Sequence, residues 1–251
     1  MIKVLINGIN GKMGQIILKQ IEKDNDLKMV VGVDIKEVND NQYPIYQNIK
    51  EVIDEVDIII DFSIPYATFK ALEYAKEKNL PIIIATTGFT KEEEELIKEY
   101  SKFIPVFKES NMAYTIHLIA DIISKLAVIL DNSDIEIIET HHNKKIDAPS
   151  GTALALADSI NKVFKDKLNY EYNRHDKHIK RENGEIGIHS IRGKNEIGSH
   201  SIIFFRDNET IEITHKALNR IIYADGVIKI AKELVKKDKG YYIMKDIIND
   251  E

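Results

Sequence analysis

The chain has 251 residues, of which 43% are hydrophobic and 30% charged, a composition typical of a globular protein rather than a disordered one. Its net charge of −6 disfavours a general nucleic-acid-binding protein, which needs a basic surface. The sequence contains no cysteine, which excludes disulfides, thiolate zinc sites and cysteine nucleophiles.

The first residues, "MIKVLING", are strand-like and do not have the pattern of a signal peptide. No apolar run in the sequence reaches the roughly 20 residues that a membrane-spanning helix needs. We therefore expect a cytoplasmic protein.

Apolar runs and helical patterns alternate over the first 110 residues. Strands are predicted at 2–7, 29–34, 57–63, 81–87 and 104–110. Helices are predicted after the first strand, over 66–78, and from Thr90, where Glu93 completes a capping box. Because the strands are apolar throughout rather than alternating, we expect a parallel sheet covered on both faces. This part of the chain is therefore predicted to be a doubly wound α/β domain.

The pattern changes after residue 113. Long helices are predicted over 114–130, 151–164 and 220–237, and strands at 134–140, 186–192, 200–206 and 210–216. The last two strands flank Asp207-Asn208-Glu209, a hairpin-like turn. The basic stretch 174–183 is interpreted as a solvated loop. These features predict a second, α+β domain with a mixed or antiparallel sheet.

Three glycines follow the first predicted strand. Gly8, Gly11 and Gly14 lie in "GINGKMG", directly before a helix, where a tight turn and free helix N–H groups form a site for a pyrophosphate. Asp34 ends the second predicted strand, where an acid can accept hydrogen bonds from ribose hydroxyls. Asp34 points to NAD, and Lys36 leaves NADP open. An ordinary tight turn followed by a surface acid is the plainer alternative.

Small or polar clusters close three further predicted strands. They are Phe62-Ser63, Ala85-Thr86-Thr87 and Ser110-Asn111-Met112. Dinucleotides bind at the carboxyl ends of the strands in such sheets, so the clusters together indicate a cofactor groove.

A histidine-rich block follows the strand predicted at 134–140. His141 and His142 lie at its exit, Lys145 follows in a loop, and Ser150 is a good N-cap for the next helix. The backbone N–H groups of that helix start can bind a carboxylate. Histidine or lysine can deliver a proton while a nicotinamide supplies a hydride, although a solvated polar loop before a capped helix is the alternative.

At this point the sequence resembles a known family. "ETHHNKKIDAPSGTA" is similar to the signature E-x-H-H-x-x-K-x-D-A-P-S-G-T of dihydrodipicolinate reductases, enzymes of bacterial lysine and diaminopimelate synthesis. Other segments resemble that family in the same order: "GINGKMG", "ATTGF", "SNMA", "IHSIRG", "HKALNR" and "GYYIMKDII". The resemblance spans nearly the whole chain; its histidine block is highly specific and its glycine turn is not.

The resemblance implies two domains and one reaction. A Rossmann domain over 1–113 and 217–251 would bind NADH or NADPH, and a substrate-binding domain over 114–216 would build a homotetramer through its sheet. The implied reaction is the reduction of 4-hydroxy-tetrahydrodipicolinate to tetrahydrodipicolinate with loss of water.

The resemblance also implies roles for individual residues. His141 and Lys145 would be catalytic, and His142, Gly151 and Thr152 would bind the dicarboxylate substrate. The implied cofactor-binding residues are Gly8, Ile9, Asn10, Gly11, Lys12, Met13, Asp34, Lys36, Ala85, Thr86, Thr87, Ser110, Asn111, Met112 and Ala113.

The sequence departs from the family pattern at two places. After Arg192 and Gly193, Lys194 stands where many members carry a second glycine, and Ser199 stands where they carry a glutamate.

A metal site and two rival functions are weighed against this interpretation. The remaining histidines are interpreted as structural or exposed; they are His117, His175, His178, His189, His200 and His215. No metal site is predicted, because no convergent ligand set is evident. Another nicotinamide-dependent oxidoreductase is one rival function. A dinucleotide-sensing regulator is the other, although it leaves the histidine block unexplained.

Overall fold

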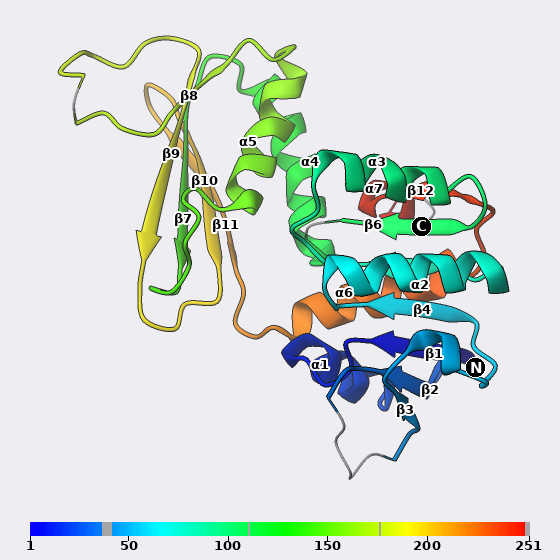
Figure 1. Ribbon diagram of the computed structural model, residues 1–251. Coiled ribbons are helices and arrows are strands. Elements are labelled where there is room, and N and C mark those ends of the chain that lie inside the picture. Colours follow the sequence, from blue (N-terminus) through cyan, green and yellow to red (C-terminus); the bar gives the residue numbers. More distant parts are fainter. Residues whose placement is uncertain (37–41, 110, 176, 249–251) are drawn as a thin grey trace. The chain divides into compact units, whose positions relative to one another are not determined.

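The computed structural model describes residues 1–36, 42–109, 111–175 and 177–248. The chain divides into two units. Unit 1 comprises Met1–Tyr114 and Ile221–Glu251, and unit 2 comprises Thr115–Arg220. Each unit has its own sheet and its own hydrophobic core (Figure 1).

In the described part of unit 1, seven parallel strands form one sheet in the order β12-β6-β5-β4-β1-β2-β3. Its strands are β1 (Ile2–Asn7), β2 (Leu27–Val33), β3 (Ile45–Tyr46), β4 (Ile58–Asp61), β5 (Ile82–Ile84), β6 (Pro105–Lys108) and β12 (Gly240–Tyr242). The helical elements of the unit are α1 (Lys12–Ile21), η1 (Ile49–Glu51), α2 (Pro65–Lys78), α3 (Lys91–Tyr100), α6 (Ile221–Leu234) and α7 (Met244–Ile248).

Both faces of this sheet are covered, as the apolar strands predicted. Successive residues of β1 point to opposite faces, so Val4 and Ile6 pack with α1 and α6, whereas Leu5 packs with α2 and α3. Figure 1 shows α2 and α6 on opposite sides of the strands. The predicted doubly wound α/β domain is therefore confirmed.

The ends of the helices follow local sequence rules. The predicted capping box at α3 is present: the Thr90 side chain accepts the Glu93 N–H, and the Glu93 carboxylate accepts the Thr90 N–H at 2.8 Å. Asn79 ends α2 in the left-handed conformation with φ of 55°. The short elements β3, η1, β12 and α7 were not predicted, because two to five residues give no periodicity to detect.

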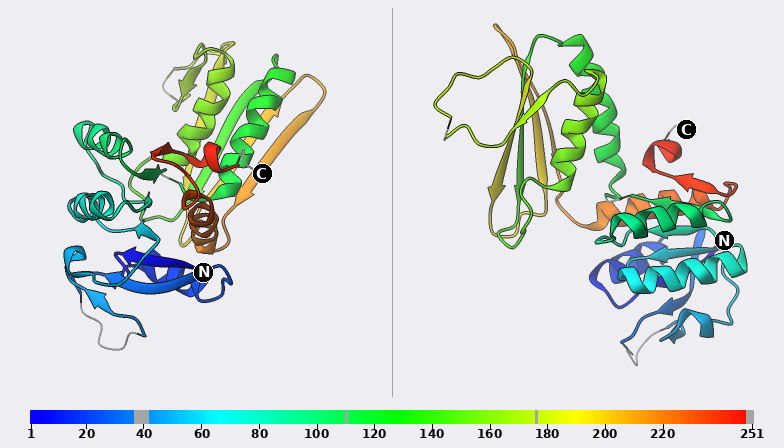
Figure 2. Two further views of the ribbon diagram at one scale, coloured as in Figure 1. Left: turned by 90° about the vertical axis from the view of Figure 1, so that its right-hand side faces the viewer. Right: turned by 45° about the horizontal axis from the view of Figure 1, so that its top comes forward.

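Unit 2 has a mixed sheet, as predicted. The described residues form five strands in the order β11-β10-β7-β9-β8; β7, β8 and β9 run parallel, and β10 runs antiparallel to β7 and β11. Helices α4 and α5 pack on one face of the sheet (Figure 2). The elements of the unit are α4 (Tyr114–Ile129), β7 (Asp134–His141), α5 (Gly151–Val163), β8 (Asn169–Glu171), β9 (Glu185–Arg192), β10 (Ser199–Phe205) and β11 (Thr210–Lys216).

The segment 174–183, expected to be a solvated loop, is in part attached to this sheet. Arg174 pairs with Glu136 at 3.1 Å and with Glu185 at 2.9 Å, and Arg181 Nη2 donates to the Glu185 carbonyl at 2.7 Å. Arg181 Nε also pairs with Glu136 at 3.5 Å, so two basic side chains of this segment neutralise carboxylates on β7 and β9. The spacing of single charges in a loop does not reveal such partners.

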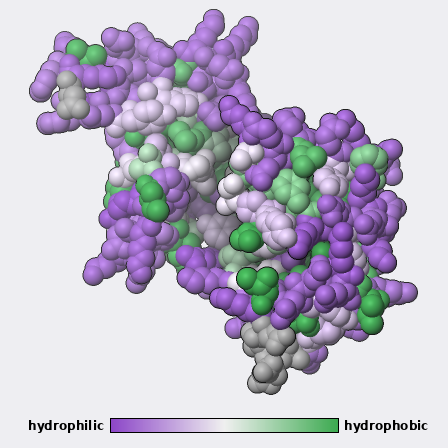
Figure 3. All heavy atoms as spheres, in the orientation of Figure 1, coloured by the Kyte–Doolittle hydropathy of each residue, from purple (hydrophilic) through white to green (hydrophobic). Residues whose placement is uncertain are grey.

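The visible surface is mostly hydrophilic, with separate hydrophobic side chains (Figure 3). No helix among the described residues is long and apolar enough to cross a membrane.

Candidate functional site

The glycine turn after β1 has a shape that side chains would not permit. Gly8 has φ of 83°, and a Cβ there would lie 2.5 Å from the Phe62 carbonyl oxygen. A Cβ on Gly14 would lie 2.4 Å from the Gly8 carbonyl oxygen. The backbone of α1 can therefore lie directly against the turn. No side chain caps α1 at Gly11, so its first N–H groups remain available to an anion.

Asp34 fixes this turn to the end of β2. One carboxylate oxygen accepts the Asn10 N–H at 2.9 Å, and the other accepts the Lys36 N–H at 3.0 Å. The Asn10 side chain donates in turn to the Lys36 carbonyl at 2.6 Å. The acid predicted to meet a ribose thus also holds the backbone around it.

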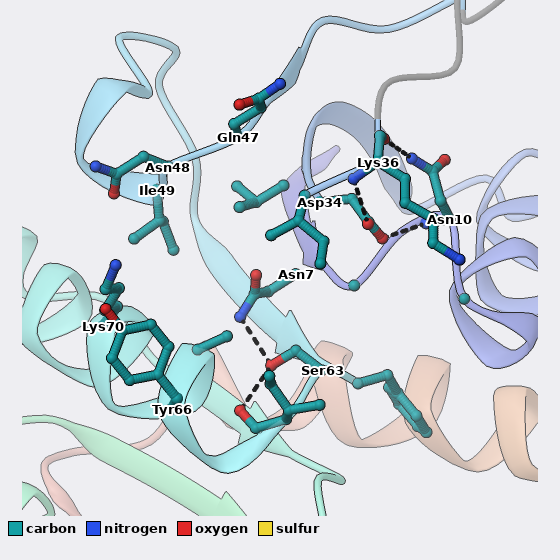
Figure 4. Close-up of a pocket in the computed structure, with 17 residues that line it drawn as sticks. Asn7, Asn10, Asp34, Lys36, Gln47, Asn48, Ile49, Ser63, Tyr66 and Lys70 are labelled. Atoms are coloured by element: carbon teal, nitrogen blue, oxygen red, sulfur yellow. Dashed lines mark hydrogen bonds between the residues drawn. The ribbon is translucent and has the colours of Figure 1, made fainter.

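A cavity of about 310 Å³ opens beside the turn within unit 1. Figure 4 shows Tyr66 and Lys70 of α2 on one side and Asp34, Lys36 and Asn10 on the other. A glycine cradle, an uncapped helix start, an acid at the end of β2 and this cavity together fit a dinucleotide. The lining also includes Asn7, Gly8, Gly11, Val33, Ile35, Gln47, Asn48, Ile49, Phe62, Ser63, Ile64 and Ala67.

Not every residue predicted to bind the cofactor presents its side chain there. Ile9 is 1% exposed and lies in the hydrophobic core, so only its backbone can meet a ligand. Lys12 is exposed and Met13 is half-buried; neither lines the cavity.

The residues predicted at the later strand ends differ in their exposure. Thr86 is buried, Thr87 is exposed and Ala85 is half-buried, directly after β5. Met112 and Ala113 are buried, and Asn111 Oδ1 accepts the Ala113 N–H at 2.9 Å. Ser110 lies outside the described residues. None of these residues lines the cavity.

In unit 2, a buried carboxylate orients the first histidine of the block. Glu139 and His141 lie on the same face of β7, and His141 Nδ1 is 2.5 Å from a Glu139 oxygen. Arg192 of β9 donates to both Glu139 oxygens, at 2.7 and 2.9 Å, and the Ser150 N–H donates to one at 3.2 Å.

These contacts determine the protonation of Glu139. Burial raises the pKa of Glu139, but hydrogen bonds from Arg192, Ser190 and His141 outweigh it and lower the pKa to about 2. An ionised carboxylate can only accept, so His141 carries its proton on Nδ1. Nε2 is then the nitrogen of the neutral ring that can exchange a proton. It lies 3.1 Å from where a Gly198 Cβ would be, so glycine leaves room beside it.

Lys145 lies in the loop between β7 and α5. Its Nζ pairs with Asp147 at 2.8 Å, and this hydrogen bond lowers the pKa of Asp147. Arg192 Nη2 donates to the Asp147 carbonyl at 2.7 Å, so the same arginine holds both the loop and Glu139. The Ala148-Pro149 bond that follows is cis.

The start of α5 is capped and open to a ligand. Ser150 Oγ accepts the Ala153 N–H at 3.1 Å, as predicted for an N-cap, and lies 3.2 Å from His200 Nε2. A Cβ on Gly151 would meet nothing within 4 Å, so that backbone is accessible. Thr152 beside it is half-buried.

His142 presents an unused nitrogen. Its Nδ1 is buried and has no hydrogen-bond partner among the described residues. A buried polar atom without a partner is uncommon in proteins, and a bound ligand is one group that can satisfy it.

Three residues of this cluster, Glu139, Arg192 and His200, were not among the predicted site residues. Glu139 had a detectable signal, because it precedes His141 by two positions on a predicted strand. His200, grouped with the structural or exposed histidines, is 4% exposed, and its ring centroid lies 5.2 Å from that of His141. Burial and the His141 ring lower the pKa of His200 to about 4. In the described residues, no three His, Asp or Glu side chains gather to hold a metal ion.

Comparisons with known proteins agree along the whole chain. The family described as "Dihydrodipicolinate reductase, N-terminus" matches residues 2–112, and "Dihydrodipicolinate reductase, C-terminus" matches residues 115–248. The 4-hydroxy-tetrahydrodipicolinate reductase of Caldanaerobacter subterraneus is 41% identical over 99% of this chain and 98% of its own length. That of Clostridium novyi is 42% identical over 100% of both chains.

A solved structure is similar over nearly the whole chain. The dipicolinate-bound dihydrodipicolinate reductase of Paenisporosarcina sp. TG-14 has a TM-score of 0.81 at 26% identity, covering 97% of each chain. On these findings, the chain belongs to the dihydrodipicolinate reductase family.

Proposed function

We propose that this chain performs the family's reaction with cofactor residues in unit 1 and substrate residues in unit 2. The reaction is the reduction of 4-hydroxy-tetrahydrodipicolinate to tetrahydrodipicolinate by NADH or NADPH, with loss of water, in lysine and diaminopimelate biosynthesis. The bound nicotinamide supplies the hydride. The residues of the chain bind, orient and handle protons.

Unit 1 would hold the cofactor along the carboxyl ends of its strands. The Gly8–Met13 turn and the start of α1 would receive the pyrophosphate, and Asp34 the adenosine ribose. Lys36 is exposed and can meet a 2′-phosphate, so both cofactors fit this end of the site. Further contacts would come from Ala85, Thr86, Thr87, Ser110, Asn111, Met112 and Ala113.

Unit 2 would hold the two carboxylates of the substrate. The N–H groups of Gly151 and Thr152 begin α5, and His142 adds a nitrogen that lacks another partner. Dipicolinate bound to the Paenisporosarcina protein is a planar dicarboxylate of the same kind. A carboxylate at this helix start would gain roughly 0.3–1 kcal/mol, and more when partly buried.

His141 and Lys145 would move the protons. Ionised Glu139 keeps His141 Nδ1 protonated, so Nε2 is the atom that gives or accepts a proton. Loss of hydroxide from the substrate requires a proton, and the Lys145 ammonium can donate one. Positioned groups of this kind contribute roughly 10²–10⁴ in rate.

We also propose a cytoplasmic homotetramer. Strand β11 lies at the edge of the unit 2 sheet, and its residues alternate between exposed and half-buried along its length. Such an edge can be covered by a second copy. Light scattering should then give four times the chain mass of 28.8 kDa. A monomer mass at working concentrations would contradict the tetramer.

The observation that carries the catalytic assignment is the Glu139–His141 contact beside the open start of α5. The test follows NADH or NADPH absorbance with freshly made dihydrodipicolinate synthase product. Rapid oxidation is expected for the wild type. His141→Ala and Lys145→Ala should each lose at least about 100-fold in kcat while keeping cofactor affinity.

Two exposed basic residues outside the proposed site provide controls: Lys144 precedes Lys145 in the loop, and His175 lies in the 174–183 segment. Lys144→Ala and His175→Ala should keep kcat within about twofold, because surface substitutions away from a site change little. Near-normal turnover of the His141 or Lys145 variant would contradict its assigned role. Cofactor binding by the wild type without any turnover would support a sensor instead.

A further inference from the structure

Unit 1 contains a fully buried carboxylate that the proposed chemistry does not use. Asp61 is the last residue of β4, which lies between β1 and β5 in the sheet, and it is 0% exposed. A carboxyl group without access to water is retained only where hydrogen bonds compensate its burial, and burial raises the pKa of Asp61. Its surroundings therefore indicate what it does.

Four neutral groups donate to Asp61. Asn7 Nδ2 and Ser63 Oγ donate to one oxygen, at 2.7 and 2.5 Å. Thr68 Oγ1 and Thr86 Oγ1 donate to the other, at 2.6 and 2.9 Å. We call these five residues the Asp61 network.

Three of the four donors come from the ends of adjacent strands. Asn7 ends β1, Ser63 follows β4, and Thr86 follows β5. The Ser63 N–H also donates to Thr86 Oγ1 at 3.1 Å, which joins the last two directly. Only Thr68 belongs to a helix, α2, rather than to a strand end.

The network is continuous with the glycine turn. The Phe62 N–H donates to the Asn7 carbonyl at 3.0 Å, and Gly8 lies so close to the Phe62 carbonyl that a Cβ would not fit. A change in the position of Phe62 would therefore move the turn. Asp61, one residue earlier, fixes that position from within the sheet.

We propose that Asp61 is a positioning residue for the dinucleotide site: it holds the ends of β1, β4 and β5 in the one arrangement that accepts the cofactor. This inference rests on the proposed function of unit 1. A purely structural position at the centre of a sheet would be served as well by an apolar residue, since buried charges rarely add stability.

The experiment compares Asp61→Asn with Thr68→Val in the full-length protein. Asp61→Asn keeps the shape of the side chain but replaces one carboxylate oxygen with an NH2 group, which cannot accept a hydrogen bond. Either Thr68 and Thr86 or Asn7 and Ser63 then lose their acceptor. Thr68→Val removes one donor, but on a helix rather than a strand end. The Kd of NADH is measured by nicotinamide fluorescence, kcat and KM by turnover, and stability by thermal unfolding.

Asp61→Asn is expected to raise the Kd and KM of NADH about tenfold while kcat changes by less than about threefold. Thr68→Val should lower the unfolding temperature but leave the Kd within about twofold. An unchanged Kd in Asp61→Asn, or an equal rise in Thr68→Val, would overturn the inference. If Asp61→Asn does not fold, Asn7→Ala keeps the carboxylate and removes one strand-end donor. A rise of about threefold in Kd is then expected, and no rise refutes the role.

Titration of the wild-type protein with NADH or NADPH distinguishes failure of the proposed function from failure of this inference. Wild-type protein that fails to bind NADH or NADPH overturns the proposed function and this inference with it. If the wild type binds NADH and Asp61→Asn has the same Kd, this inference alone is overturned.

Discussion

Glu139 lies 2.5 Å from His141 Nδ1, two residues earlier on the same strand, and Arg192 of the neighbouring strand binds both of its oxygens. Residues of two neighbouring strands thus hold the ring of the proposed catalytic histidine in place. Because hydrogen bonds from Arg192, Ser190 and His141 lower the pKa of Glu139 to about 2, its carboxylate is ionised near neutral pH and accepts this hydrogen bond. The ring orientation and the tautomer of His141 are both set by this acceptor.

Replacing Glu139 by glutamine should lower kcat by roughly 10²-fold or more, because a side-chain amide can donate to Nδ1 and favour the other tautomer. The Kd of the cofactor should not change, since unit 1 is untouched. Glu136→Gln is the matched control: Glu136 lies on β7 but pairs with Arg174 and His189. Equal kcat values for the two variants would show that Glu139 does not orient the catalytic ring.

The same carboxylate makes stability depend on pH in the acid range. Its pKa is lowered from 4.5 to about 2, so the unfolded chain binds a proton before the folded protein does. The stabilisation is complete above pH 4.5 and is lost as the pH falls towards 2, on the order of 3 kcal/mol in total. Wild type and Glu139→Gln, unfolded chemically at pH 5, 4 and 3, should therefore converge. A constant difference in unfolding free energy would contradict this.

His200 makes stability depend on pH over a higher pH range than Glu139 does. Burial is the main cause that lowers the pKa of His200 from 6.5 to about 4, and electrostatic repulsion by His141 adds to it. The unfolded chain then takes up a proton between these values and the folded protein does not, so stability falls as the pH drops from 6.5 to 4, by on the order of 3 kcal/mol. Burial also lowers the pKa of His215, which adds to the loss. His200→Asn should flatten the curve in this window, and an unflattened curve would contradict the assignment.

Local features of the proposed sites could be predicted from the sequence, whereas contacts between distant residues could not. The glycine turn, Asp34 and the Ser150 cap are local patterns, and the structure places them as the spacing predicted. Arg192 meets Glu139 across 53 positions because β7 and β9 pair in parallel, with His141 beside Arg192. Sequence order does not predict that register. Asp61 lies inside the strand predicted at 57–63, and its donors come from β1, α2 and the segments after β4 and β5, so no local pattern reveals them.

Lys194 departs from the family pattern and has a backbone conformation that favours glycine. It stands where many relatives carry glycine, and its φ is 24°, in the region that favours glycine. Lys194→Gly should raise the unfolding temperature by about 1–3 °C. Lys239→Gly, at an exposed position without a positive φ, should lower it instead. A decrease in both variants would show that Lys194 is not strained.

The glycine turn can be tested by comparing two alanines in the same motif. A Cβ at position 14 would lie 2.4 Å from the Gly8 carbonyl oxygen and 2.6 Å from that of Ile9, both backbone atoms that cannot move alone. A Cβ at position 11 would lie 3.1 Å from the Gly8 carbonyl oxygen and needs only a small adjustment. Gly14→Ala should therefore move the turn and raise the Kd of NADH at least about tenfold, whereas Gly11→Ala should raise it about threefold or less. Isothermal titration at matched folded fractions measures both. A larger rise in Kd for Gly11→Ala than for Gly14→Ala would contradict this. It would mean that a bound phosphate lies close to residue 11, and that the ligand rather than the backbone contacts of the turn requires glycine.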